Sequence, residues 1–136
     1  MRYKPDQSYV VVIADVKNFK LINNIYGIRV GDDILRYLAK IISKALTDGL
    51  AARYSDDQFV MFTSIPKNDF EKYLENAVRY ISENAPITNL LVKYGVYKDV
   101  DKSLSISEIC DRAIMAMKSI QLNYEKNIAY YDDQLG

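Results

Sequence analysis

The sequence contains no histidine and only one cysteine, Cys110. Without histidine, this chain has neither an imidazole for acid–base catalysis nor a His-ligated zinc site. With a single cysteine it has no internal disulfide, which is typical of proteins from a reducing compartment. Any chemistry must therefore depend on carboxylates, amides, hydroxyls and the basic side chains.

Neither sign of charge is in excess, because 18 basic side chains balance 18 acidic ones. Proteins that bind nucleic acid or anionic membranes obtain much of their affinity from surplus Lys and Arg, so we expect no nucleic-acid partner and no direct membrane contact. The longest apolar run, Tyr9 to Ala14, is much shorter than the ~20 residues of a membrane span. The initial MRYKPDQS also lacks the apolar centre of a signal peptide. We therefore expect a cytoplasmic domain.

Strand-like and helix-like segments alternate along the chain and predict a single domain over residues 1–136. SYVVVIADV (Ser8–Val16) is a continuous β-branched run, typical of a strand that is covered on both faces. Two apolar runs separated by SDD predict a β-hairpin. The predicted elements after the first strand are helices over 18–27 and 32–46, hairpin strands over 50–54 and 58–65, a helix over 66–84, a strand over 89–97, a helix over 104–120 and a strand over 127–132.

The predicted order is β-α-α-β-β-α-β-α-β. Hairpin strands pair antiparallel, which excludes a doubly wound parallel sheet. We predict an α/β fold of the α+β sandwich type, with a ferredoxin-like, mostly antiparallel sheet of about five strands flanked by helices. In the helix over 104–120, Ser105 and Glu108 have the spacing of a capping box. Its predicted inward residues are Ile106, Ile109, Cys110, Ala113, Ile114 and Met117.

Carboxylates stand where ligands often gather. Asp15 lies at the end of the first strand, and Asp56 and Asp57 lie at the tip of the hairpin. Each has a structural alternative, since Asp15 could cap the next helix and the hairpin pair could form the turn. If the sheet brings the strand end beside the hairpin, Asp15 and Asp57 would offer Mg²⁺ hard oxygen ligands. A magnesium site is therefore the hypothesis that the spacing supports.

The segment DVKNFKLINNIYGIRVGDDIL (Asp15–Leu35), followed by RYSDDQF (Arg53–Phe59), resembles the GGDEF domain family, the diguanylate cyclases. The first family motif runs Asp-x-Asp-x-Phe-Lys-x-x-Asn-Asp-x-x-Gly-His-x-x-Gly-Asp-x-x-Leu, and the signature hairpin is Gly-Gly-Asp/Glu-Glu-Phe. CDRAIMAMKSI (Cys110–Ile120) is similar to the late family helix Ala-Asp-x-Ala-Leu-Tyr-x-Ala-Lys. The matching residues are Asp15, Phe19, Lys20, Asn23, Gly27, Gly31, Asp32, Leu35, Arg53, Asp57, Phe59, Asp111, Ala113 and Lys118.

This resemblance implies a nucleotidyl-cyclase-like sheet, a GTP site and Mg²⁺ as cofactor. The implied contacts are Asp15, the Val16 carbonyl and Asp57 for the metal, Asn23 and Asp32 for guanine, and the backbone near Phe19 and Lys20 together with the Lys118 side chain for phosphates. An amide and a carboxylate can read the guanine edge, and a lysine and a metal can neutralise phosphate charge. The residues alone leave open that Asp32 is a helix N-cap, Asn23 a solvated helix position and Lys118 a surface charge.

The chain departs from the family where catalysis takes place. The signature hairpin here is Ser55, Asp56, Asp57, Gln58 and Phe59, so both glycines are lost and Gln58 stands for the catalytic glutamate. An amide cannot accept a proton as a general base. We therefore expect the catalytic positions, Asp57 and Gln58, to be impaired.

Further departures follow the same trend. Lys17, Asn24 and Ile28 replace the family's second and third acidic residues and its histidine, and Leu122 stands where an arginine usually meets phosphate. The Arg-x-x-Asp of the family's product-inhibition site is Leu46-Thr47-Asp48-Gly49 in this chain. Product feedback through that site is not expected.

Four functions remain open. The first is a degenerate GGDEF domain that binds GTP or regulates a neighbouring EAL-like or sensor domain, because AYYDDQLG resembles the segment leading into an EAL domain. The second is an active cyclase that makes cyclic di-GMP from two GTP molecules, for which a homodimer would be needed. The third is a slow NTP hydrolase, and the fourth is an interaction domain that holds no nucleotide.

Overall fold

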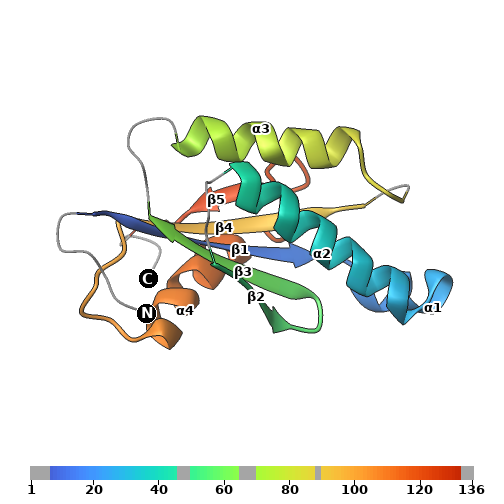
Figure 1. The fold of residues 1–136 in the computed structure, drawn as a ribbon, viewed down its shortest axis with the longest axis horizontal. Helices are drawn as coiled ribbons and strands as arrows, with labels where there is room; N and C mark the ends of the chain where they lie inside the picture. The colour runs from blue at the N-terminus through green and yellow to red at the C-terminus, as the bar shows by residue number, and fades with distance from the viewer. Residues whose placement is uncertain (1–6, 46–49, 65–69, 88–89, 133–136) are drawn as a thin grey trace.

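The computed structural model describes residues 7–45, 50–64, 70–87 and 90–132 (Figure 1). The predicted order of helices and strands is confirmed. The elements are β1 (Tyr9–Val16), α1 (Phe19–Tyr26), α2 (Ile28–Ala45), β2 (Leu50–Ser55), β3 (Gln58–Ser64), α3 (Phe70–Glu83), β4 (Val92–Lys98), α4 (Ile106–Lys118) and β5 (Ile128–Tyr130).

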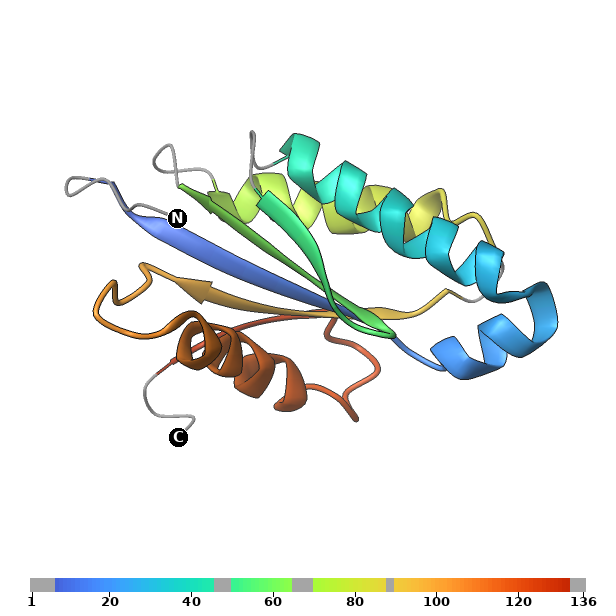
Figure 2. The same cartoon turned by 60° about the horizontal axis from the view of Figure 1, so that its bottom comes forward.

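The described strands form one five-stranded sheet in the order β2-β3-β1-β4-β5. β1 pairs antiparallel with both β3 and β4, β2 pairs antiparallel with β3, and only β5 pairs parallel, with β4. Helices α2 and α3 cover one face and α4 covers the other, while α1 projects at one end of the sheet (Figures 1 and 2). The mostly antiparallel α/β sandwich predicted from the sequence is confirmed.

The burial of β1 explains its β-branched sequence. All eight of its residues are buried, because side chains alternate between two separate apolar clusters. Val10, Val12 and Ala14 join the cluster beneath α2 and α3. Val11 and Ile13 join the cluster beneath α4. The charged residue Asp15 therefore stands on the α4 face of the sheet, at the open end of β1.

Helix α4 lies directly against the sheet. A Cβ on Gly95 would be 2.0 Å from the Ala113 carbonyl oxygen, so the absence of a side chain permits this contact. The predicted capping box is confirmed, because the Ser105 hydroxyl accepts from the Glu108 N–H and the Glu108 carboxylate accepts from the Ser105 N–H. Ile106 was predicted to face the core, and this is wrong because the first helical residue is 53% exposed.

Helix α2 begins earlier than the sequence pattern predicts. It starts at Ile28, one residue after Gly27, whose φ of 95° allows the chain to turn between the two helices without an extended linker. Asp32 consequently lies inside the helix and is not its N-cap, so that alternative is wrong. The predicted start of α3 at Pro66 and the residues 46–49 of the altered product-inhibition motif lie outside the described residues.

An aromatic cluster fastens the C-terminal strand to α4. The Arg112 guanidinium lies 5.3 Å from the ring centre of Tyr97 and 5.2 Å from that of Tyr131, and Arg112 donates a hydrogen bond of 2.9 Å to the Tyr97 hydroxyl. The two rings meet edge to face with their centres 5.3 Å apart.

No helix in the described part of the chain is long and apolar enough to cross a bilayer.

Tyr130, the last residue of β5, packs on the face of the sheet opposite the aromatic cluster, and it provides a test of the packing of this strand. Its hydroxyl oxygen is buried without a hydrogen-bond partner, and burial raises the pKa of Tyr130 to about 12 from an ordinary value of 10.0. Folded protein then holds the proton where unfolded chain releases it, so stability falls as pH rises from about 10 to about 12. We expect Tyr130→Phe to make this decline shallower and to leave stability near pH 7 unchanged or raised by up to ~1 kcal/mol.

The measurement is urea unfolding at a series of pH values. Tyr124→Phe is the matched control, because Tyr124 is 85% exposed and its substitution should leave the profile unchanged. An identical alkaline decline in wild type and Tyr130→Phe would contradict the burial of this hydroxyl.

Candidate functional site

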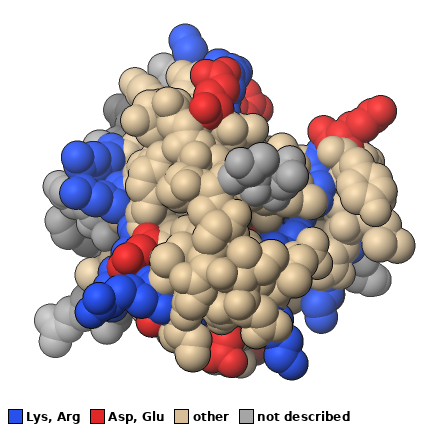
Figure 3. Space-filling model, turned by 90° about the vertical axis from the view of Figure 1, so that its right-hand side faces the viewer, with Lys and Arg blue, Asp and Glu red and all other residues tan. Residues whose placement is uncertain are grey.

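A cavity of about 490 Å³ opens between α1, α2 and the β2–β3 turn. Its volume lies within the range of small-molecule sites. Figure 3 views the molecule from the end at which α1 lies, where most of the visible surface is uncharged. The lining residues are Phe19, Lys20, Asn23, Ile28, Asp32, Arg53, Asp56 and Asp57. The structure thus gathers most of the residues that the sequence assigned to nucleotide and metal.

The α1 wall depends on one glycine. A Cβ on Gly31 would stand 2.0 Å from Asn23 Oδ1 and 2.9 Å from the Phe19 ring, so glycine lets α2 approach α1 at this point. Asn23 Oδ1 is buried and has no hydrogen-bond partner. An unpaired buried acceptor is costly, so this oxygen keeps an unused capacity to accept a hydrogen bond.

Arg53 spans the cavity and was not assigned to the site from the sequence. Its Nη1 lies 2.6 Å from Asp32 Oδ1, its Nη2 donates 2.5 Å to the Asp56 carbonyl, and its Nε donates 3.3 Å to the Ser55 carbonyl. The guanidinium also lies 5.8 Å from the Phe19 ring centre. The carboxylate predicted to bind guanine is therefore already paired.

The Arg53–Asp32 ion pair is weak enough for a ligand to replace Arg53 at the Asp32 carboxylate. The Arg53 and Asp32 side chains are 43% and 33% exposed, and ion pairs in such positions contribute about 0–1 kcal/mol. A ligand that donates to Asp32 can take the place of Arg53 at small cost. The sequence signal for Arg53 was present, since it matches the family residue two positions before the signature.

The open end of β1 lies beside the hairpin, as the magnesium hypothesis requires. In the sheet register Asp15 stands opposite Gln58 on one side and Lys93 on the other. The Val16 N–H donates a hydrogen bond of 3.0 Å to the Asp57 carbonyl oxygen. These contacts bring together the strand end and the signature residues, which are more than 40 positions apart in the sequence.

The electrostatics of Asp15 reflect this crowding. Burial raises the pKa of Asp15, the nearby Asp57 carboxylate raises it further, and the Lys17 ammonium together with the Gln58 side chain lowers it. Asp15 is 5% exposed. The pKa of Asp15 stays above its ordinary value because burial outweighs the attraction of the Lys17 ammonium.

The two carboxylate oxygens of Asp15 differ in their partners among the described residues. Oδ1 is buried without a hydrogen-bond partner, whereas Oδ2 lies 3.3 Å from Lys17 Nζ. Asp15 Oδ1, the Val16 carbonyl and Asp57 are the hard oxygen donors that would hold a divalent cation. Among the described residues, no group of three or more His, Cys, Asp and Glu is arranged for a metal. These donors thus fit a divalent cation only in part. The Lys17 ammonium already lies beside the Asp15 carboxylate that would bind such an ion.

The signature turn is rebuilt around a hydroxyl. Ser55 Oγ lies 3.1 Å from Asp57 Oδ1 and 3.0 Å from Gln58 Oε1. A hydroxyl has one proton, so it donates to one of these oxygens at a time. Ser55 consequently holds the remaining acidic residue and the substituted catalytic position close to each other.

Lys93 is a second residue that sequence reasoning missed. Its side chain is buried, and its ammonium donates to the Asn123 carbonyl at 2.6 Å, to the Lys126 carbonyl and to Asn127 Oδ1 at 3.4 Å. Burial lowers the pKa of Lys93, and the Lys17 charge lowers it further. No periodic pattern marks this position, because its place opposite Asp15 depends on the strand register.

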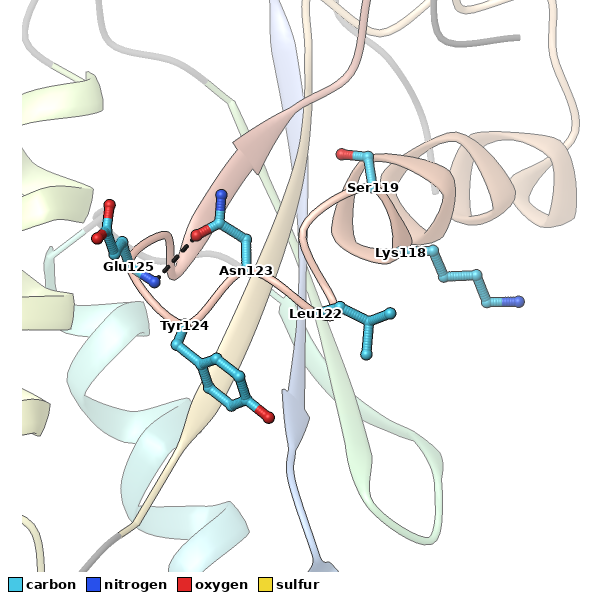
Figure 4. Close-up of a pocket in the computed structure, with 6 residues that line it drawn as sticks. All are labelled: Lys118, Ser119, Leu122, Asn123, Tyr124 and Glu125. Atoms are coloured by element: carbon cyan, nitrogen blue, oxygen red, sulfur yellow. Dashed lines mark hydrogen bonds between the residues drawn. The ribbon is translucent and has the colours of Figure 1, made fainter.

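Lys118 lies apart from the main cavity. It lines a separate hollow of about 610 Å³ with Ser119, Leu122 and the turn that carries Asn123, Tyr124 and Glu125 (Figure 4). The Lys118 side chain extends away from Tyr124 and Glu125 in this view. Leu122, which stands at the expected arginine position, is 89% exposed. The predicted phosphate contact of Lys118 stays a prediction.

Comparisons with known proteins identify the family to which this chain is similar. The family profile described as "Diguanylate cyclase, GGDEF domain" matches residues 2–127. Signaling protein YkoW of Bacillus subtilis is 40% identical over 136 residues, covering 93% of this chain and 17% of YkoW. Probable diguanylate cyclase DgcT of Escherichia coli is 28% identical over 127 residues, covering 85% of this chain and 28% of DgcT. This chain therefore spans less than a third of the length of these relatives.

A solved structure confirms the fold. The EAL/GGDEF domain protein from M.capsulatus superposes with a TM-score of 0.78 at 22% identity, covering 97% of this chain and 90% of that chain. A sequence identity of 22% supports a shared fold and no conclusion about function.

Gly31 tests the packing of the cavity wall. In an exposed helix, Gly→Ala would stabilise by ~0.5–1 kcal/mol. Here the added Cβ collides with Asn23 and Phe19, and we expect Gly31→Ala to lower the free energy of unfolding by about 1–3 kcal/mol.

Urea unfolding of a double-mutant cycle separates the two effects. Asn23→Ala removes the nearer obstacle, so it should cost less stability in the Gly31→Ala background than in wild type. A stabilising Gly31→Ala would contradict the close approach of α1 and α2.

Proposed function

Since this chain belongs to the GGDEF domain family of cyclic di-GMP signalling, we propose that it is a catalytically impaired member that binds GTP and regulates a neighbouring domain. The observation that carries the proposal is the composition of the cavity between α1, α2 and the hairpin. Phe19, Lys20, Asn23, Asp32 and Asp57 all line it. The residues that the family resemblance assigns to guanine thus face the same space as the retained acidic signature residue.

Guanine recognition follows from the chemistry of two side chains. The amide of Asn23 carries both donors and an acceptor, and its oxygen has no hydrogen-bond partner among the residues that the structure describes. The Asp32 carboxylate accepts hydrogen bonds and is held in place by Arg53 until a ligand donates to it. Adenine presents a different donor and acceptor pattern, so this pair would favour guanine.

Catalytic impairment follows from the signature turn. Gln58 stands opposite Asp15 in the sheet and, as an amide, cannot act as a general base. Asp56 lines the cavity and adds a negative charge near the expected phosphates. At an effective dielectric of about 20, two such charges ~4 Å apart repel by ~4 kcal/mol before screening. The turn therefore disfavours the highly charged arrangement that phosphoryl transfer requires.

A regulatory role is supported by the length of the relatives. This chain covers 17% of YkoW and 28% of DgcT, so similar domains occur as parts of larger proteins. One structural neighbour is described as an EAL/GGDEF domain protein. GTP could influence such a neighbour only if its affinity differs between two states of the pair.

One observation favours a nucleotide-free interaction domain instead. Arg53 already pairs with Asp32 and lies 5.8 Å from the centre of the Phe19 ring, so a side chain of the domain itself takes the carboxylate predicted to bind guanine. The calorimetric experiment below distinguishes this alternative from the GTP-binding function.

The first test is calorimetric titration with GTP and with ATP, in Mg²⁺, followed by assays of the same sample for cyclic di-GMP and released phosphate. We expect GTP to bind more tightly than ATP, with neither product formed. Cyclic di-GMP would establish an active cyclase, and phosphate a hydrolase. No binding of either nucleotide would leave the interaction domain.

Matched variants locate the binding. Asn23→Ala and Asp32→Ala should each weaken GTP by about tenfold, which corresponds to ~1.4 kcal/mol, and should abolish the preference over ATP. Exposed Asn24 on the same helix provides the control, because Asn24→Ala should change neither affinity. Unaltered GTP selectivity in both site variants would show that guanine binds elsewhere.

The second test restores the family signature. Ser55→Gly and Asp56→Gly together with Gln58→Glu remove the added charge and return a carboxylate to the catalytic position. We expect cyclic di-GMP formation to rise by ~10²-fold or more above the background of the unaltered domain. The two glycine substitutions without Gln58→Glu are the control, and product from that double variant would refute the role assigned to Gln58.

A further inference from the structure

Lys17 and Asp15 form an ion pair at the end of β1, beside the hairpin residue Asp57 that lines the cavity. We propose that the Lys17 ammonium is a built-in cation at the predicted metal carboxylate, so that this domain binds the phosphates of GTP without requiring a divalent ion. The inference rests on the proposed function, because it concerns the same site. It assigns the positive charge to a residue of the chain itself.

The backbone holds Lys17 in a fixed place. Its N–H donates a hydrogen bond of 2.9 Å to the Leu91 carbonyl, just before β4, and the preceding Val16 N–H donates to the Asp57 carbonyl at 3.0 Å. The following residue, Asn18, adopts the left-handed conformation with φ 56° and begins α1. Position 17 is thus clamped between β4, the hairpin and α1.

The Lys17 side chain reaches back to the end of the strand. Lys17 is the first residue after β1, in the turn that leads into α1. Its Nζ lies 3.3 Å from Asp15 Oδ2, and the two side chains are 19% and 7% exposed. The ammonium is therefore held at a largely buried carboxylate.

A second lysine reinforces the effect. Lys93 stands opposite Asp15 in the sheet, and its buried ammonium is bound by carbonyl oxygens of the turn after α4. The two lysines therefore lie on either side of the same carboxylate, Lys17 next to it along the chain and Lys93 across the sheet. A divalent cation arriving at Asp15 would face repulsion from two fixed positive charges. Metal binding here is consequently opposed by the protein.

The same ammonium suits phosphate. Lysine provides a compact charge with three N–H donors, and the structure assigns one of them to Asp15. Charge-assisted hydrogen bonds from an ammonium to phosphate oxygens are among the stronger ones in proteins. The family has an acidic residue at the position of Lys17, so the substitution both removes a negative charge and introduces a positive one.

The first measurement uses Mn²⁺ alone, without nucleotide, followed by electron paramagnetic resonance. Wild type should bind Mn²⁺ weakly, and Lys17→Met should bind it about tenfold more tightly because the competing charge is gone. Lys17→Asp, which restores the family residue, should bind it more tightly still. Lys40→Met, on the exposed side of α2, removes an equal charge away from the site and should match wild type.

The second measurement is GTP calorimetry in Mg²⁺ and in EDTA. We expect wild-type affinity in the two buffers to agree within about threefold, whereas Lys17→Met should lose about tenfold or more in EDTA and Lys17→Asp should depend on Mg²⁺ most strongly. Circular dichroism verifies folding, and Lys17→Gln replaces the methionine variant if that one does not fold.

The outcomes separate this inference from the proposed function. Equal Mn²⁺ affinity in wild type and the Lys17 variants, or a wild-type GTP affinity that collapses in EDTA, would overturn the role of Lys17. If no protein binds GTP in either buffer, the proposed GTP-binding function fails, and the Mn²⁺ titration alone decides whether Lys17 acts as the cation at Asp15.

Discussion

The site depends on the complete burial of β1 between β3 and β4. All eight residues of β1 are buried, so this strand stays out of water only as a central strand with both faces of the sheet covered. The one carboxylate of β1, Asp15, therefore lies near the end of this central strand, where it is buried. The hairpin and α1 are assembled around that fixed point through the hydrogen bond between Val16 and Asp57.

Much of the fold could be predicted from the sequence, because its signals are local. The β-branched run of β1, the Ser105–Glu108 capping box and the hairpin around Asp56 all appear where the pattern placed them. The start of α2 was misjudged, since a single glycine with positive φ replaced the expected linker. Ile106 was misjudged because helical spacing does not reveal where the packed part of a helix ends.

The site was predictable in composition but not in charge balance. Family resemblance indicated Asn23, Asp32 and Asp57, and the structure brings all three to one cavity. The resemblance could not indicate that Arg53 forms an ion pair with Asp32 or that Lys93 stands opposite Asp15. Both contacts depend on pairing between segments that are distant in the sequence. Lys17 was visible as a departure, yet its direction toward Asp15 required the geometry of the strand end.

The stack of Tyr97, Arg112 and Tyr131 has a mechanical consequence. Strand β5 has three residues and, among the described strands, pairs only with β4, so by itself it is a weak attachment for the chain that leaves it. The guanidinium held against both rings transfers that attachment to α4. A force or rotation applied to the chain after Tyr131 would then be transmitted to the thirteen-residue helix α4, which packs on the sheet. Without the Arg112 contacts, the same force would only detach the short strand β5.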